Sequence, residues 1–190
     1  MNLFYEEYPT KIIVDGHEIP IITDFREYVR LMDMLKDDDL SFQEKICCLS
    51  QYFLETPSNF ASAMNALTDF VTMKSRTASF EEENVDVKEV ENRKEVYSFE
   101  YDYPFIFSAF LSEYKINIRT IPYLHWWEFK MLFDGLSEKT EIKQRIMYRS
   151  IELSTIKDKK ERERIQKIQN AIRLPEDKVS DYDIGDAFGW

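Results

Sequence analysis

Apolar side chains recur at helical spacing along most of the chain, and the densest such block lies between Tyr103 and Phe133. A corner at 117–122 divides this block into two predicted helices. The second helix is apolar on two sides, because at about 100° per residue its apolar positions fall into two stripes. One stripe consists of Leu124, Trp127 and Met131, and the other of Trp126, Phe129 and Phe133. Such a helix is either covered on all sides inside a bundle or offers its second stripe to a partner, and both interpretations stay open.

The same spacing predicts further helices before and after this block. Side-chain oxygens that bond the free amides of a first helical turn mark where they begin. These N-caps are Thr23 or Asp24, Ser41 in a capping box with Glu44, Thr56 before Pro57, and Ser137 after a C-capping Gly135. The last predicted helix, within 158–172, is highly charged and carries a narrow stripe of Ile165, Ile168 and Ile172. This stripe is typical of a terminal helix lying on its own bundle or of a seam for a partner.

Extended structure is expected in two short places. Two apolar runs flank Asp15-Gly16 within 11–22, which is a strong hairpin signal because glycine tolerates positive φ. Aromatic and polar residues alternate over 97–103, so we expect extended chain there, with Asp102 as the N-cap of a helix beginning near Pro104. The predicted fold is mainly α: a helical bundle with a small N-terminal β-hairpin, forming one domain over 1–174.

Acidic residues concentrate in two segments that lack a helical pattern. The net charge is -11; nine acidic and three basic residues lie between Glu81 and Tyr103, and five acidic and one basic between Pro175 and Trp190. We therefore predict a flexible acidic insertion at 75–95 and an acidic C-terminal tail at 175–190. Binding to a nucleic-acid backbone requires the opposite charge, so we expect no nucleic-acid partner.

Neither a membrane partner nor an enzymatic site is indicated. No apolar run approaches the roughly 20 residues that span a bilayer. The adjacent Cys47 and Cys48 are expected as small core residues of a protein in the reducing cytosol. His125 and Glu128 lie three residues apart, but a zinc site needs three or four ligands, and the other histidine, His17, belongs to the hairpin. The chain contains no phosphate-binding loop or nucleophile elbow. We therefore expect no metal, no cofactor and no enzymatic activity, and a protein that acts by contact.

Three long segments of the second half resemble a known protein family. They read FEYDYPFIFSAFLSEYKINI, LHWWEFKMLFDGL and IMYRSIELSTIKDKKERERIQKIQNAI, and the N-terminal YPTKIIVDGHEIPIITDF matches the opening of the same family. On these segments the chain is similar to the phage gene-product-fifteen proteins of phages and prophages of Gram-positive bacteria. The resemblance implies a role in tail morphogenesis, beside tail assembly chaperones that keep the tape-measure protein soluble, and it carries over no catalytic residues.

The resulting hypothesis is a helical, non-enzymatic tail assembly chaperone in the cytoplasm of the bacterial host, with the tape-measure protein as its partner. The residues predicted to bind that partner are Trp126, Phe129, Phe133, Trp127, Ile165, Ile168 and Ile172. One alternative is an acidic decoy that occupies a host nucleic-acid-binding protein, and another is a minor structural subunit of the tail. Homo-oligomerisation stays open, because an edge strand and an exposed helix face are both expected.

Overall fold

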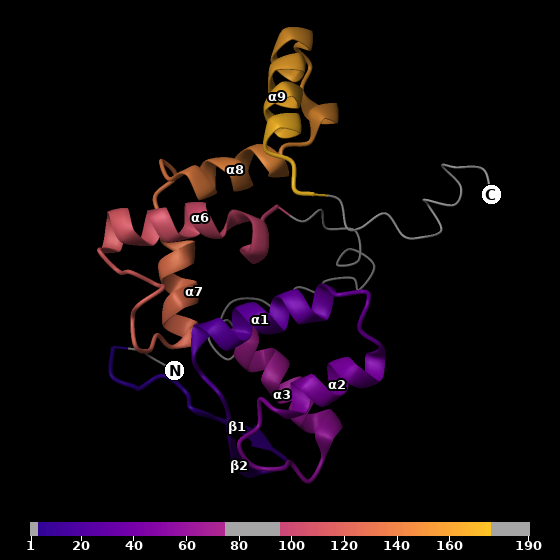
Figure 1. Cartoon of the computed structure of the whole chain (residues 1–190), viewed down its shortest axis with the longest axis vertical. Coiled ribbons are helices and arrows are strands. Elements are labelled where there is room, and N and C mark those ends of the chain that lie inside the picture. Colours follow the sequence, from indigo (N-terminus) through magenta and orange to yellow (C-terminus); the bar gives the residue numbers. More distant parts are fainter. Residues whose placement is uncertain (1–3, 75–95, 176–190) are drawn as a thin grey trace, which may run out of the picture. The chain divides into compact units, whose positions relative to one another are not determined.

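The computed structural model of the chain describes residues 4–74 and 96–175. Within these residues the protein is mainly helical, with a two-stranded antiparallel sheet near the N-terminus (Figure 1). This architecture confirms the predicted fold class. The predicted acidic insertion at 75–95 and, apart from Pro175, the predicted tail lie outside the described residues. None of the helices in 4–74 and 96–175 is long and apolar enough to cross a membrane.

The elements belong to two compact units. In chain order they are strands β1 (Lys11–Val14) and β2 (His17–Pro20), helices α1 (Phe25–Lys36), α2 (Phe42–Ser50), α3 (Phe60–Val71) and α6 (Phe99–Ala109), the π-helix η1 (Phe110–Tyr114), helices α7 (Trp126–Asp134) and α8 (Glu141–Ser150), the 3-10 helix η2 (Leu153–Thr155) and helix α9 (Lys159–Ala171). Of the described residues, unit 1 comprises 4–74 and 110–136, and unit 2 comprises 96–109 and 137–175. The single domain expected over 1–174 stays a prediction.

The hairpin forms where the sequence predicts it. Its register pairs Lys11 with Pro20 and Val14 with His17. The two turn residues both have positive φ, 48° at Asp15 and 83° at Gly16, which is the backbone of a two-residue turn that matches strand twist. β1 packs against α3, so the apolar face of the hairpin is buried within unit 1.

Local side-chain chemistry decides where most helices start. Asp24 caps α1, and Ser41 with Glu44 forms the predicted capping box on α2. Two predicted starts are wrong. α3 begins later than expected because the side chain of Asn59, not Thr56, accepts the amide of Ser62 (3.2 Å). α8 likewise starts after Thr140, because Ser137 accepts the amide of Lys139 (3.2 Å) in the preceding turn.

The segment predicted to be extended, 97–103, is instead largely helical. α6 begins at Phe99, where the hydroxyl of Ser98 accepts the amide of Tyr101 (3.4 Å). Asp102 lies inside the helix and is buried, because its carboxylate pairs with Arg149 of α8. The alternating pattern favours extended chain, but the segment is helical and its Asp102 pairs with Arg149. Asp102 is therefore not an N-cap.

The two cysteines were expected in the core, but α2 does not bury them. Cys47 is exposed and Cys48 is half-buried, and both are free. α2 instead buries Leu49, which lies on the face that packs inward. The expectation of two small core cysteines is therefore wrong.

Candidate partner-binding surfaces

The tandem tryptophans, predicted either as core or as an interface, are core residues of unit 1. Trp126 is 4% exposed and Trp127 is 1% exposed. The indole N–H of Trp126 donates to the carbonyl of Val71 (3.0 Å), and that of Trp127 donates to the carbonyl of Phe70 (2.8 Å). Both carbonyls belong to the last turn of α3, where helical carbonyls lack partners within the helix. The two side chains therefore close the C-terminal end of α3.

The second apolar stripe of α7 is also covered. Phe129 and Phe133 are buried, and the ring of Phe129 stacks on Phe25 of α1 (centroids 4.5 Å apart) and on Phe110 of η1 (5.2 Å). Of the two interpretations left open for this helix, the structure supports the covered one, because α1, α3 and η1 all contact the aromatic residues of α7. The four aromatic residues predicted to bind a partner on α7 offer no surface for one in this fold.

His125 is the N-cap of α7. Its Nδ1 accepts the amide of Trp127 (3.0 Å), so the ring carries its proton on Nε2, which donates to the carbonyl of Pro9 (3.0 Å). The ring stacks on Tyr8 (centroids 4.8 Å apart) and is 2% exposed. Burial lowers the pKa of His125, and the hydrogen bond to Pro9 acts in the opposite direction. Sequence reasoning missed this role because histidine is not among the preferred capping residues.

In the described part of the chain, His125 and Glu128 do not belong to a cluster of metal-binding side chains. Among the described residues there is no group of three or more His, Cys, Asp or Glu side chains that could hold a metal ion.

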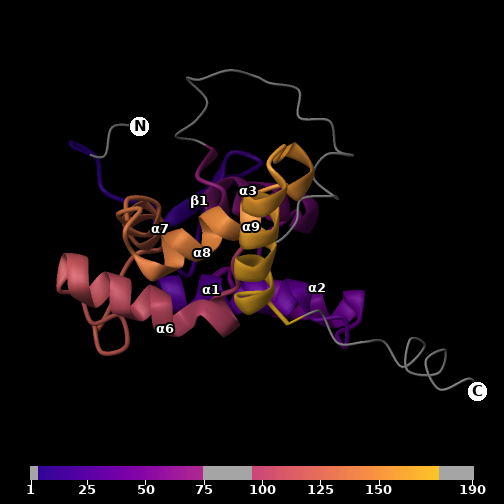
Figure 2. The ribbon, with the colours of Figure 1, turned by 90° about the horizontal axis from the view of Figure 1, so that it is seen from above.

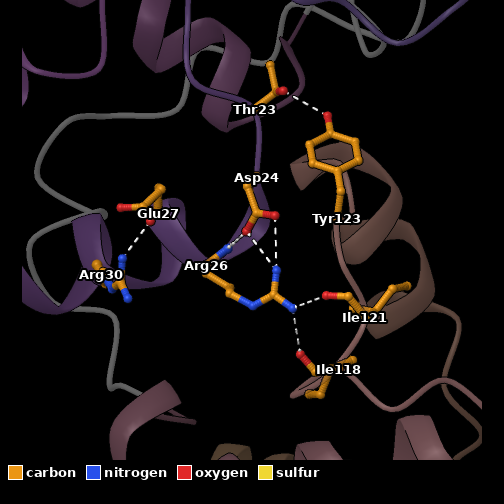
Figure 3. Close-up of polar contacts among 8 residues, drawn as sticks. All are labelled: Thr23, Asp24, Arg26, Glu27, Arg30, Ile118, Ile121 and Tyr123. Carbon is orange, nitrogen blue, oxygen red and sulfur yellow. Dashed lines mark hydrogen bonds and ion pairs between the residues drawn. The ribbon is translucent and has the colours of Figure 1, made fainter.

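A polar junction fixes the corner before α7 to the start of α1 (Figure 3). The guanidinium of Arg26 pairs with Asp24 (3.0 Å) and donates to the carbonyls of Ile118 (3.2 Å) and Ile121 (2.6 Å). The hydroxyls of Thr23 and Tyr123 lie 2.7 Å apart. Two backbone hydrogen bonds join the same segments. The amide of Phe25 donates to the carbonyl of Leu124 (3.0 Å), and the amide of Trp126 donates to the carbonyl of Thr23 (2.8 Å). These contacts hold the corner before α7, and the first residue of α7, against the start of α1.

A buried ion pair organises unit 2 in a comparable way. Arg149 donates to both carboxylate oxygens of Asp102 (2.6 and 3.1 Å), and their side chains are 5% and 1% exposed. The same guanidinium donates to the carbonyls of Val96 (3.2 Å) and Ile172 (2.8 Å). One side chain of α8 thus ties together the segment before α6 and the end of α9.

Of the predicted stripe on α9, two residues keep accessible surface. Ile165 is buried, whereas Ile168 and Ile172 are half-buried. α9 lies beside the C-terminal end of α8, where the side-chain amide of Gln169 donates to the carbonyls of Tyr148 and Ile151 (both 2.8 Å) (Figures 1 and 2). Ile165 therefore packs inside unit 2. A binding role for Ile168 and Ile172 stays a prediction.

Other large apolar side chains are exposed in both units. Those of unit 1 are Phe4, Tyr5, Ile13, Leu35, Phe42, Leu54, Leu111 and Tyr123, and those of unit 2 are Tyr101, Tyr103 and Met147. Single exposed apolar residues are normal on a protein surface, so their exposure alone marks no binding site.

Comparison with known proteins bears on the resemblance seen in the sequence. A family model described as Bacteriophage Gp15 protein matches residues 5–174, which is most of the chain. A search of curated proteins and a search of solved structures each found no match. The matched range includes the hairpin, the tandem tryptophans and α9. The chain therefore belongs to the Bacteriophage Gp15 protein family.

Proposed function

We propose that this phage protein acts in the host cytoplasm during tail assembly, binding the tape-measure protein without catalysing a reaction. Membership of the phage family supports a phage role, and the resemblance implies the setting of tail morphogenesis. The observation that carries the binding role is the apolar edge at the end of α9. Ile165 is buried, but Ile168 and the C-cap residue Ile172 stay partly accessible beside charged side chains. Such an edge contacts an apolar helix face of a client through a few side chains.

The charge of the whole chain fits a factor that keeps its client soluble. A net charge of -11 opposes association between complexes through like-charge repulsion. The apolar edge on α9 would cover part of the client, while the remainder of the protein supplies charge to the complex.

The test is co-expression with the tape-measure protein of the same phage, followed by affinity capture and a comparison of client solubility. We expect a complex, with the client soluble only in the presence of this protein. Ile168→Ser should reduce the captured client about tenfold, because most of an interface's binding energy rests on a few apolar contacts. Ile13→Ser is the matched control, since Ile13 is 70% exposed on the hairpin of the other unit.

Circular dichroism of each variant separates loss of binding from loss of fold. If wild-type protein captures no client and leaves it insoluble, the proposal is wrong. Equal loss of capture in Ile168→Ser and Ile13→Ser would remove α9 as the binding site.

A further inference from the structure

α9 is covered on one side only, and its faces are fixed by contacts within unit 2. Every residue of α9 is exposed except Ile165, which is buried, and Ile168 and Gln169, which are half-buried. Gln169 bonds the end of α8, and Arg149 bonds the carbonyl of Ile172. The exposed face of the helix is thereby held in a defined orientation within its unit.

The segment that contains α9 carries the opposite charge to the chain as a whole. Residues 157–173 contain seven basic and three acidic residues, a balance of +4, against a net charge of -11 for the protein. Lys160, Arg164 and Lys167 follow each other at i, i+4 and i+7, which places them in one stripe along the helix. Arg164 pairs with Glu161 (2.8 Å), whereas Lys160 and Lys167 have no ion-pair partner among the described residues.

The basic stripe borders the accessible isoleucines. Ile168 lies one turn after Arg164, so an apolar edge and a row of cations run side by side along α9. A binding partner that satisfies both must itself be apolar on one side and anionic beside it. Carboxylates spaced by one and two turns of a helix match this arrangement.

We propose that the exposed face of α9 binds an acidic amphipathic helix, whose apolar side packs on Ile168 and Ile172 and whose carboxylates pair with Lys160 and Lys167. The inference rests on the proposed function for the identity of the client that supplies this helix. A nucleic acid is disfavoured as occupant, because Glu161 and Glu163 lie within the same helix and the chain as a whole repels phosphate.

Fluorescence anisotropy with the full-length chain tests the proposal. Three kinds of labelled probe are used. The first is a pair of model helices with the same leucine pattern, one carrying glutamate beside the leucines and the other lysine. The others are overlapping peptides of the tape-measure protein and a single-stranded DNA. We expect binding of the glutamate peptide and of acidic amphipathic tape-measure segments, weakened by added salt. Lys160→Glu and Lys167→Glu should each weaken it about three- to tenfold.

Lys139→Glu is the matched control, because Lys139 is exposed in the turn before α8 and the charge change is the same. It should leave affinity unchanged. Equal binding of the glutamate and lysine peptides, or no effect of either reversal on α9, would overturn the proposal, as would DNA binding that is lost in the same two variants.

The two proposals fail in different ways. Charge-dependent binding of the glutamate peptide without binding of any tape-measure segment would support the acidic-helix surface and contradict the proposed client. Capture of the tape-measure protein that is indifferent to both charge reversals would support the client and overturn the acidic helix.

Discussion

At the scale of single residues, the indole groups of Trp126 and Trp127 show how two neighbouring side chains can both be core. They diverge by about 100° around a helix axis, yet their N–H groups reach consecutive carbonyls of α3. This is possible because both lie in the first turn of α7, where the end of another helix covers them. A large apolar body with one donor suits a site that is buried and also needs a hydrogen bond.

Trp126→Ala should therefore destabilise the protein. Removal of a buried tryptophan typically costs about 3–5 kcal/mol, and the carbonyl of Val71 also loses a donor. Urea denaturation followed by circular dichroism measures the change. Tyr103→Ala, at a side chain that is 60% exposed, should stay within about 0.5 kcal/mol of wild type. Unchanged stability of Trp126→Ala would contradict the core assignment.

His125 should make stability depend on pH. Its pKa is lowered in the folded protein by burial, so between the unfolded value of about 6.5 and the lower folded value the unfolded state binds more protons. Stability is therefore full above about pH 6.5 and is lost as pH falls through this window. Protonation would also place a hydrogen on Nδ1, which accepts the amide of Trp127.

His125→Asn provides the comparison, because asparagine can cap α7 without titrating. The free energy of unfolding, measured between pH 5 and 7, should fall less steeply with acid in this variant than in wild type. Parallel profiles would show that His125 is not responsible.

At the scale of elements, the pair of Asp102 and Arg149 joins α6 to α8. Asp102→Asn should destabilise unit 2 by about 3–5 kcal/mol, because it leaves a buried guanidinium without its counter-charge. The exposed pair of Glu18 and Lys11 (2.7 Å) supplies the control, and Glu18→Gln should cost at most about 1 kcal/mol. Urea denaturation measures both. If the two neutralisations cost the same, the buried pair does not organise the unit.

At the scale of the whole molecule, each compact unit has a buried centre of its own. Unit 1 has the aromatic cluster around Phe129, and unit 2 has the ion pair with Ile106, Ile142 and Ile165. A domain with its own core can unfold on its own. We therefore expect the two units to unfold in separate steps.

Trp126 and Trp127 both belong to unit 1, so in a Trp190→Phe background tryptophan fluorescence reports that unit alone. Asp102→Asn should lower the urea midpoint of the helical signal by about 1 M or more while the fluorescence midpoint stays in place. Coincident, equally shifted transitions would instead favour the single domain predicted over 1–174.

Features set by neighbouring residues were predictable from the sequence. The Asp15-Gly16 turn, the capping box of Ser41 and Glu44 and the charged helix α9 each depend on contacts within a few residues. For the same reason the mainly α fold and its N-terminal hairpin follow from periodicity alone. Family membership also follows from the sequence, since it depends on residue order.

The features that only the tertiary structure decided depend on contacts between residues that are far apart in the sequence. Trp126 is buried, and its indole donates to the carbonyl of Val71, 55 positions away in the sequence. Asp102 lies inside a helix and pairs with Arg149, 47 positions away. Periodicity shows that a helix has two apolar stripes or a charged face, but it cannot show what covers each one. Of the candidate residues predicted on α7 and α9, only Ile168 and Ile172 therefore keep accessible surface, because packing against distant segments, and not local pattern, determines which apolar side chains stay accessible.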